Sequence, residues 1–247
     1  MTTHIEDIHL DVDDARIAGM ILRPQTELPG ILFVHGWGGS QQRDLGHAMK
    51  LAGLGCICLT FDLRGHEATD AQRRTVSREQ NLADVVAAYD RLAAHPALDR
   101  SNIAVIGTSY GGYLATLLSA LRPVRWLALR VPAIYPDGNW NTPKQLLDRE
   151  ALMRLRHRVC KPDENQALTA CEQFDGDVLL VESEHDRFVP HTTIMNYRNA
   201  FALARSMTHR LIDGADHALS REEHLVAYDS ILNSWVSEMV IGSRTSL

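Results

Sequence analysis

The sequence predicts one α/β domain built on a doubly wound, mostly parallel sheet, and three of its features indicate this class. Short apolar runs alternate with amphipathic stretches, the order typical of parallel strands joined by covering helices. The length of 247 residues suits one substantial core. The content of 45% hydrophobic and 23% charged residues is that of an ordinary folded chain. We therefore expect a single domain over residues 1–247.

The chain is expected to open with an antiparallel hairpin. Residues 8–12 and 16–23 flank Asp13 and Asp14, and we expect this hairpin on the edge of the sheet. The opening residues MTTHIEDIHL lack the basic and apolar regions of a leader, and no later segment is long enough to cross a membrane. The expectation is a cytoplasmic protein with no membrane span.

Six buried strands are expected after the hairpin. Each is an apolar run too short for a helix and bounded by breakers or polar residues. The six runs are residues 30–35, 56–62, 103–107, 126–130, 177–182 and 208–212. Such a series, with helices between its members, predicts a doubly wound sheet.

Two helices are marked clearly in the sequence. Ser77 and Gln80 have the spacing of a capping box, and apolar residues recur at helical spacing from Leu82 to Leu92 before His95-Pro96 ends the run. The last helix is expected over about 220–240. Its apolar stripe, which we interpret as core rather than a cofactor contact, consists of Leu225, Tyr228, Ile231, Leu232 and Trp235.

Composition limits the partners and cofactors. A net charge of −6 argues against nucleic acid, because a duplex binder usually carries a basic stripe. The four cysteines show neither a C-x-x-C pair nor zinc-ligand spacing, and Cys56 and Cys58 are interpreted as small core residues. We expect no metal and no cofactor. The sequence indicates no particular oligomeric state.

The segment Gly107-Thr108-Ser109-Tyr110-Gly111 has the pattern G-x-S-x-G. It follows the apolar run IAVIG and precedes an apolar stretch with helical character. A serine between strand and helix in this pattern sits on a sharp turn, which needs small flanking residues. Ser109 is therefore the candidate nucleophile.

A serine nucleophile needs a base, and the base needs an acid that orients it. Asp186 and His217 meet this requirement in the order Ser, Asp, His, each just beyond a predicted strand. Groups at the carboxyl ends of parallel strands meet on one rim of the sheet. The nearby acids Glu182, Glu184, Asp213 and Asp216 are weaker candidates, and His185 and His191 are interpreted as loop histidines.

The Gly-rich turn His35-Gly36-Trp37-Gly38-Gly39 follows another predicted strand. We expect the backbone amides of Trp37 and Tyr110 to form an oxyanion hole, which would stabilise the charge of a tetrahedral intermediate. His35 is expected to brace the loop rather than to take part in chemistry.

Taken together, HGWGG, FDLRGH, GTSYGG and the Asp186 and His217 loops make the chain resemble the α/β-hydrolase superfamily over nearly its whole length. FDLRGHEAT is similar to the F-D-x-x-G-H-G-x-S segment of the cinnamoyl/feruloyl-esterase and monoglyceride-lipase group, with Glu67 and Thr69 in place of Gly and Ser. SYGGY also resembles prolyl-oligopeptidase-type catalytic domains, although no propeller precedes it. Dienelactone hydrolases are similar in size but use cysteine. The resemblance implies the α/β-hydrolase fold and the triad and oxyanion residues named above.

Between the predicted strands, residues at about 132–175 are expected to form a short helical cap. Apolar candidates for an acyl pocket, or simply for seating the cap, are Tyr135, Trp140, Leu152, Met153 and Leu155. Basic residues gather here as well, and a solvated helix face explains them better than an anionic substrate; they are Arg149, Arg154, Arg156, Arg158 and Lys161.

These features predict a serine hydrolase that cleaves a small-molecule carboxylic ester of small or medium acyl size through an acyl-enzyme. A peptidase or amidase with the same triad is the alternative enzyme. A non-catalytic hydrolase fold that binds a ligand is the alternative outside enzymes.

Overall fold

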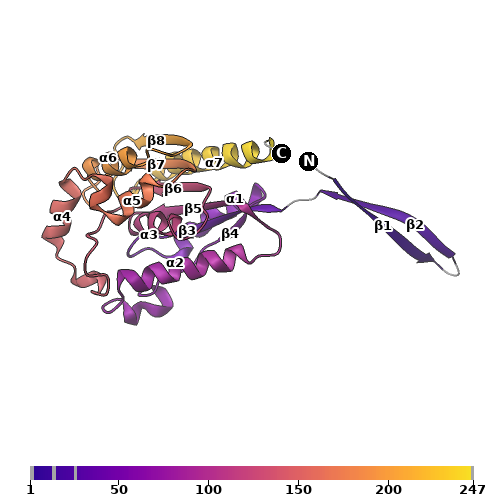
Figure 1. Ribbon diagram of the computed structural model, residues 1–247, viewed down its shortest axis with the longest axis horizontal. Coiled ribbons are helices and arrows are strands. Elements are labelled where there is room, and N and C mark those ends of the chain that lie inside the picture. The colour runs from indigo at the N-terminus through magenta and orange to yellow at the C-terminus, as the bar shows by residue number, and fades with distance from the viewer. Residues whose placement is uncertain (1–2, 13–14, 25–26, 246–247) are drawn as a thin grey trace.

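The computed structural model describes residues 3–12, 15–24 and 27–245, and its centre is a six-stranded parallel sheet (Figure 1). The strands lie in the order β4-β3-β5-β6-β7-β8. Their bounds are Leu28–Val34 (β3), Ile57–Leu59 (β4), Leu98–Thr108 (β5), Trp126–Arg130 (β6), Asp177–Ser183 (β7) and Ser206–Ile212 (β8). All six predicted strands are present, although β4 has 3 residues and is shorter than expected. The predicted doubly wound sheet is confirmed.

The N-terminal hairpin is present, but its expected place is wrong. Strands β1 (Thr3–Val12) and β2 (Ala15–Pro24) pair antiparallel, with Asp13 and Asp14 outside the described residues. They form a separate 2-stranded sheet instead of extending the edge of the main one. One edge strand of the main sheet, β4, has 3 residues and so offers few free backbone groups to a further strand.

Helices cover both faces of the sheet, as the alternating pattern predicts. One face carries α1 (Gln41–Gly53) and α7 (Glu222–Thr245), whose buried residues share a core cluster with Ile31, Ala128 and Leu179. Cys56 and Cys58 also pack in this cluster. The other face carries α2 (Arg78–Ala93), α3 (Tyr110–Ser119), α5 (Gln166–Glu172) and α6 (His191–Ala200).

The two helices marked in the sequence form as expected. The Ser77 side chain accepts a hydrogen bond from the Gln80 amide, and the Gln80 side chain accepts one from the Ser77 amide, which completes the predicted capping box of α2. In α7, Tyr228, Leu232 and Trp235 are buried, while Leu225 at the start of the predicted stripe is exposed.

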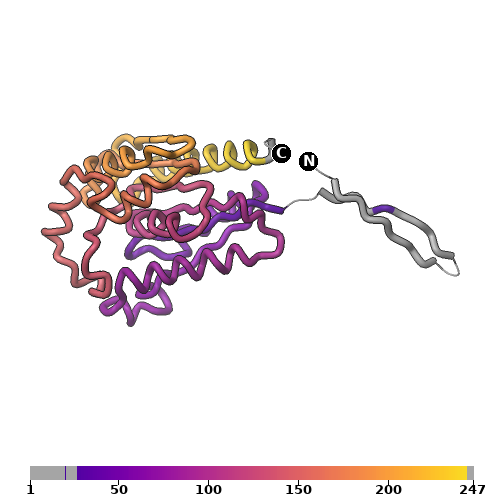
Figure 2. Tube along the Cα trace, viewed as in Figure 1, coloured from indigo at the N-terminus to yellow at the C-terminus, as the bar shows by residue number. Residues whose placement is uncertain are grey.

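Short helices fill the segment between β6 and β7. They are η2 (Lys144–Leu146), α4 (Arg149–His157), η3 (Pro162–Glu164) and α5, and α4 lies at the left end of the body in Figures 1 and 2. Leu152 and Leu155 pack against the main core cluster, so they seat this segment on the sheet domain. The division of the chain into one domain with a cap stays a prediction.

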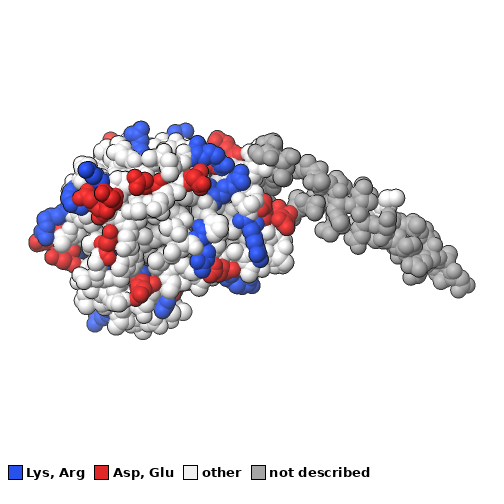
Figure 3. Space-filling model, viewed as in Figure 1, with Lys and Arg blue, Asp and Glu red and all other residues white. Residues whose placement is uncertain are grey.

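Charges on the visible surface are mixed. On the face shown in Figure 3, basic and acidic side chains are interspersed rather than gathered by sign. In the cap segment, Arg154 pairs with Glu150 and Arg158 with Glu164, as expected of a solvated helix face. Arg156 differs, because it is 7% exposed and donates to the Phe188 carbonyl. None of the helices in the described ranges is both long and apolar enough to cross a membrane.

Candidate active site

Ser109 occupies the turn between β5 and α3 in a strained backbone conformation. Its φ is 53° and its ψ is −112°, a region that residues with side chains rarely adopt. Two glycines allow this turn. A Cβ at Gly107 would lie 2.6 Å from the Gly111 carbonyl oxygen, and one at Gly111 would lie 2.0 Å from the Val34 carbonyl oxygen. Tight packing of α3 against the sheet therefore holds the serine at the rim.

Asp186 and His217 are in direct contact. Asp186 Oδ2 lies 2.6 Å from His217 Nδ1, and the carboxylate is 1% exposed. Its other oxygen, Oδ1, accepts hydrogen bonds of 2.8 Å from the amides of Phe188 and Val189. Because a carboxylate can only accept here, Nδ1 carries the proton and Nε2 is the basic nitrogen of the ring.

Three of the four competing acids have other partners. Glu182 faces His191 Nδ1 and His209 Nε2, Glu184 accepts from the Gly214 amide, and Asp216 accepts from both the amide and the hydroxyl of Ser220. Among the acids in the described chain, Asp186 is the one recorded in contact with His217.

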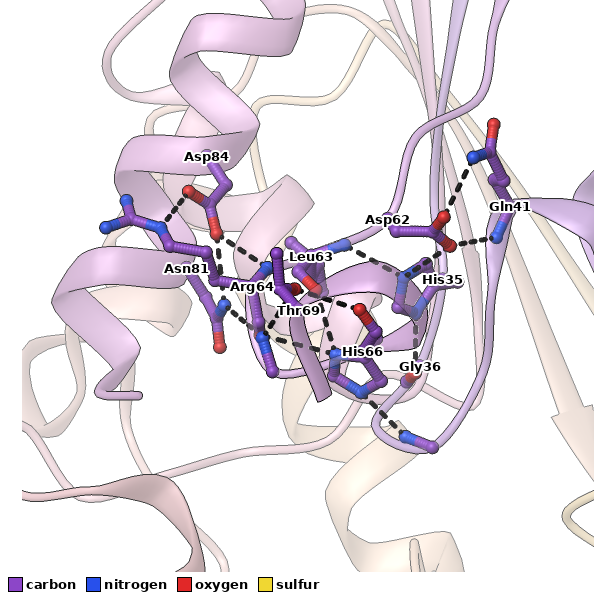
Figure 4. A network of polar contacts seen from close by, with 12 residues as sticks. His35, Gly36, Gln41, Asp62, Leu63, Arg64, His66, Thr69, Asn81 and Asp84 are labelled. Carbon is purple, nitrogen blue, oxygen red and sulfur yellow. Dashed lines mark hydrogen bonds and ion pairs between the residues drawn. The ribbon is translucent and has the colours of Figure 1, made fainter. Parts of the chain in front are cut away.

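The loop that carries Trp37 is braced by two buried histidines (Figure 4). His35 Nε2 accepts from the Leu63 amide at 3.1 Å, and its Nδ1 lies 2.8 Å from the Gly36 carbonyl oxygen. His66 Nε2 accepts from the Gly38 amide at 3.0 Å. Burial lowers the pKa of His35 to about 4 and also lowers the pKa of His66, so both act as neutral rings. His35 thus has the bracing position that the sequence indicated.

The side chain of Trp37 fixes the same loop from the other side. Its ring packs edge-on against His66 and Tyr110, with centroid distances of 4.8 and 5.7 Å. Lys144 Nζ from η2 lies 4.1 Å from the ring centroid, a cation–π contact. Burial lowers the pKa of Lys144 to about 7. Contacts from η2 and α3 therefore immobilise the backbone at Trp37.

The amides of Trp37 and Tyr110 are both available for a ligand. Within the described residues, neither amide has a recorded hydrogen-bond partner. Tyr110 is the first residue of α3, where the amide points out of the helix end. The turn at Ser109 and the Trp37 loop also touch, because a Cβ at Gly36 would lie 3.4 Å from Ser109 Cβ.

The segment that follows FDLRGH contains a residue with a strained backbone. Glu67 begins the 3₁₀ helix η1 (Glu67–Gln72) with a φ of 46°, at the glycine position of the F-D-x-x-G-H-G-x-S pattern that the sequence resembles. The hydroxyl of Thr69 stabilises this turn, because its Oγ1 accepts from the Gly65 amide and donates to the His66 carbonyl.

Glu67→Gly is therefore expected to stabilise the protein. Glycine relieves the strain of the left-handed φ, and this gain is larger than the cost of the added entropy of the unfolded chain. The free energy of unfolding should therefore rise by about 0.5–1 kcal/mol, and the Tm by about 2 °C. Thermal unfolding followed by circular dichroism measures this. Glu67→Ala is the control, because it removes the same side chain and keeps the strain. An equal gain in both variants would contradict the explanation.

A cavity of about 520 Å³ lies beside Ser109 and His217. It extends over the face covered by α1 and α7, and its lining includes Thr108, Leu219 and Tyr228. None of the five cap residues expected at an acyl pocket is among the lining residues. Tyr135 is buried in the core, and the partly buried Trp140, Leu152 and Leu155 pack against the same core.

Three charged residues of this cavity, Arg43, Asp44 and Arg130, were not singled out by the sequence reasoning. Arg130 ends β6, is 8% exposed and donates from Nη1 to the His217 carbonyl at 3.0 Å. Asp44 lies on α1 and lines the same cavity. Burial raises the pKa of Asp44 to about 7, although Arg130 and Arg43 favour its charged form. The sequence held one signal, since Arg130 continues the buried row of Trp126 and Ala128.

Asp44→Asn is expected to stabilise the protein at alkaline pH and to have little effect near pH 4. A carboxyl group whose pKa is raised on folding binds its proton more tightly in the native state, so stability falls as pH rises from about 4 to about 7. Because Asp44 is only half-buried, the loss is about 2 kcal/mol, or a Tm difference of about 4–8 °C at pH 8.

Parallel thermal melts at pH 4 and pH 8 measure the difference between variant and wild type. Asp163→Asn, on an exposed residue of η3, is the control and should change Tm little at either pH. A gain from Asp44→Asn that is the same at both pH values would contradict the burial of an ionising group.

Backbone strain gathers at this rim of the sheet. Besides Ser109, Val131 has a φ of 41° directly after β6 and Leu219 has a φ of 53° after His217. A positive φ is especially unfavourable for a β-branched residue such as valine. Strained positions of this kind cluster at functional sites, where the surrounding structure enforces them.

No group of three or more His, Cys, Asp or Glu residues in the described ranges is arranged to hold a metal ion.

Comparisons with known proteins show the family of the chain. A model of the alpha/beta hydrolase family matches residues 31–228. Uncharacterized protein Rv2307c of Mycobacterium tuberculosis (strain ATCC 25618 / H37Rv) is 28% identical over 217 residues, which is 85% of this chain and 72% of that protein.

Solved structures resemble the chain in fold. Est1E from Butyrivibrio proteoclasticus, solved with ferulic acid, aligns with a TM-score of 0.67 and 16% identity over 97% of this chain and 96% of its own. A structure from work on the metagenome-derived lipolytic enzymes LipS and LipT aligns with a TM-score of 0.63 and 18% identity over 84% of this chain and 93% of its own.

Proposed function

Since the chain belongs to the alpha/beta hydrolase family, we propose that it is a serine hydrolase that cleaves carboxylic esters of small or medium acyl size through an acyl-enzyme. One observation carries this proposal. A serine at a strained strand-to-helix turn lines the same cavity as a histidine whose Nδ1 is 2.6 Å from a buried aspartate. A nucleophile, a base and an orienting acid are the three groups that acyl transfer requires.

In the acylation step, Ser109 Oγ attacks the ester carbonyl carbon and its proton passes to His217 Nε2. Asp186 holds the ring in the tautomer with a free Nε2 and stabilises the imidazolium that forms. The carbonyl oxygen becomes an oxyanion, which accepts hydrogen bonds from the Trp37 and Tyr110 amides. When the tetrahedral intermediate collapses, the alkoxide leaves with the proton from His217.

Deacylation repeats these steps with water. His217 takes a proton from water as the oxygen attacks the acyl carbon, and then returns the proton to Ser109 as the acid is released. The neutral rings of His35 and His66 keep the Trp37 loop rigid, so its amide is already aimed when charge develops. No further group is needed for either step.

A substrate panel tests the proposal. 4-Nitrophenyl esters of different acyl length are compared with aminoacyl 4-nitroanilides, because amide cleavage also requires protonation of a poor leaving amine. We expect turnover of the esters and little or none of the anilides. Faster release from the anilides would favour the peptidase alternative, and a folded protein that cleaves neither class would favour a binding role.

A further inference from the structure

The charged residue at the end of β6 is unusual for its position. Trp126, Ala128 and Arg130 alternate onto the face of the sheet covered by α1 and α7, and the first two are core residues of that face. Arg130 extends the row into the cavity beside Ser109 and remains 8% exposed. A guanidinium in such a place is costly unless an acceptor of opposite charge compensates it.

The surrounding protein compensates Arg130 only in part. The His217 carbonyl accepts from Nη1, and the guanidinium carbon lies 5.6 Å from the centroid of the Tyr228 ring. Among the described residues, no carboxylate oxygen is recorded within 4.0 Å of the guanidinium. Burial lowers the pKa of Arg130 in spite of the more distant Asp44, Asp186 and Asp216. Its charge is therefore under-neutralised in this structure.

The other ionisable groups of the cavity leave it positive. Arg43 of α1 also lines the space, and His47 is held by the Asp229 carboxylate of α7. Asp44 is the acidic lining residue, and burial raises its pKa to about 7, so it is partly protonated near neutrality. A protonated carboxyl group can donate a hydrogen bond to an anion instead of repelling it.

We propose that this cavity is a subsite for a carboxylate carried by the substrate, with Arg130 as its principal ligand. Nη1 is engaged by His217, which leaves the Nε and Nη2 edge, a fork that matches the two oxygens of a carboxylate. The cavity joins this group to Ser109, so the preferred ester carries an acid group beyond the reacting carbonyl. This inference rests on the proposed ester hydrolysis and adds the charge of its substrate.

The test compares two esters of equal chain length, 4-nitrophenyl hydrogen adipate and 4-nitrophenyl hexanoate. The wild type is expected to show a kcat/KM about tenfold higher or more for the anionic ester. Arg130→Gln should abolish that preference, while hexanoate serves as the internal reference for any general effect through His217. Arg130→Lys, which keeps the charge without the fork, should retain part of the preference.

Arg154→Gln is the matched control, because Arg154 is an exposed cap arginine paired with Glu150, and it should leave the ratio unchanged. Arg43→Gln is a second variant that tests the subsite with Arg130 intact, in case Arg130→Gln does not fold. It should lower the ratio of the two kcat/KM values by about threefold. The subsite is overturned if the wild type cleaves the adipate and hexanoate esters with equal kcat/KM. It is also overturned if the ratio of the two kcat/KM values is the same in Arg130→Gln as in the wild type.

Failure of the subsite and failure of the proposed function give different results. If neither ester is cleaved, the proposed hydrolysis fails, and the subsite is then judged by calorimetric titration with adipate. Adipate is expected to bind the wild type and to bind Arg130→Gln at least tenfold more weakly. Equal binding, or no binding to the wild type at millimolar adipate, overturns the inference.

Discussion

Ser109→Ala is expected to reduce kcat for ester hydrolysis by about 10⁶-fold while the protein stays folded. The side chain is the nucleophile, so its removal ends the acyl-enzyme route and leaves only what positioning and the oxyanion donors give to attack by water. Alanine retains the Cβ, so the positive φ of 53° and the packing against Gly36 are unaffected. Steady-state rates with 4-nitrophenyl butyrate measure the loss of activity, and a thermal melt shows whether the variant stays folded.

Ser119→Ala provides the control for this experiment. Ser119 ends the same helix, and its hydroxyl donates to the Thr116 carbonyl at 2.7 Å, away from the cavity beside Ser109. It should keep nearly the full rate. Retention of the parental rate in Ser109→Ala would show that another residue is the nucleophile.

Asp186→Asn is expected to lower kcat by about 10⁴-fold without unfolding the loop. The Asn carbonyl oxygen can still accept from the Phe188 and Val189 amides, as Oδ1 of the aspartate does. Its amide group then faces His217 and donates to Nδ1, which moves the ring proton to Nε2. In that tautomer the histidine cannot accept the serine proton, so acylation is slowed while substrate binding is little changed.

Asp216→Asn is the matched control, because Asp216 is adjacent to His217 in sequence but bonds to Ser220. We expect a change of less than about tenfold, since only the loop bond is weakened. Ester kcat and KM are measured for both variants and the wild type. A larger loss in Asp216→Asn than in Asp186→Asn would contradict the assignment of the orienting acid.

Much of the fold was predictable because its signals are local. A parallel strand covered by helices is buried on both faces, so its apolar run is short and continuous. This is the case for β6, where the predicted bounds match the structure. The capping box of α2 depends on two residues only 3 apart. The hairpin was recognised for the same reason. Its expected place on the edge of the main sheet was wrong, because pairing between distant segments is not a local signal and periodicity does not determine it.

The candidate site was predictable where its residues directly follow the strands of a parallel sheet. Ser109, Asp186 and His217 each follow a strand, and parallel strands end on one rim. The contents of the cavity were not predictable in this way. Arg130 and Asp44 lie on β6 and α1, and only the packing of α1 on the sheet brings them together beside Ser109. The cap residues were expected there because the sequence does not tell which apolar face meets the core.

The most direct test of the central claim is covalent labelling with an uncharged fluorophosphonate, followed by mass spectrometry of the peptides. The proposal predicts one adduct per chain, on Ser109, with labelling strongly slowed in His217→Ala, because the serine then lacks its base. A folded wild-type protein that does not react, or that reacts at a residue other than Ser109, would contradict the account.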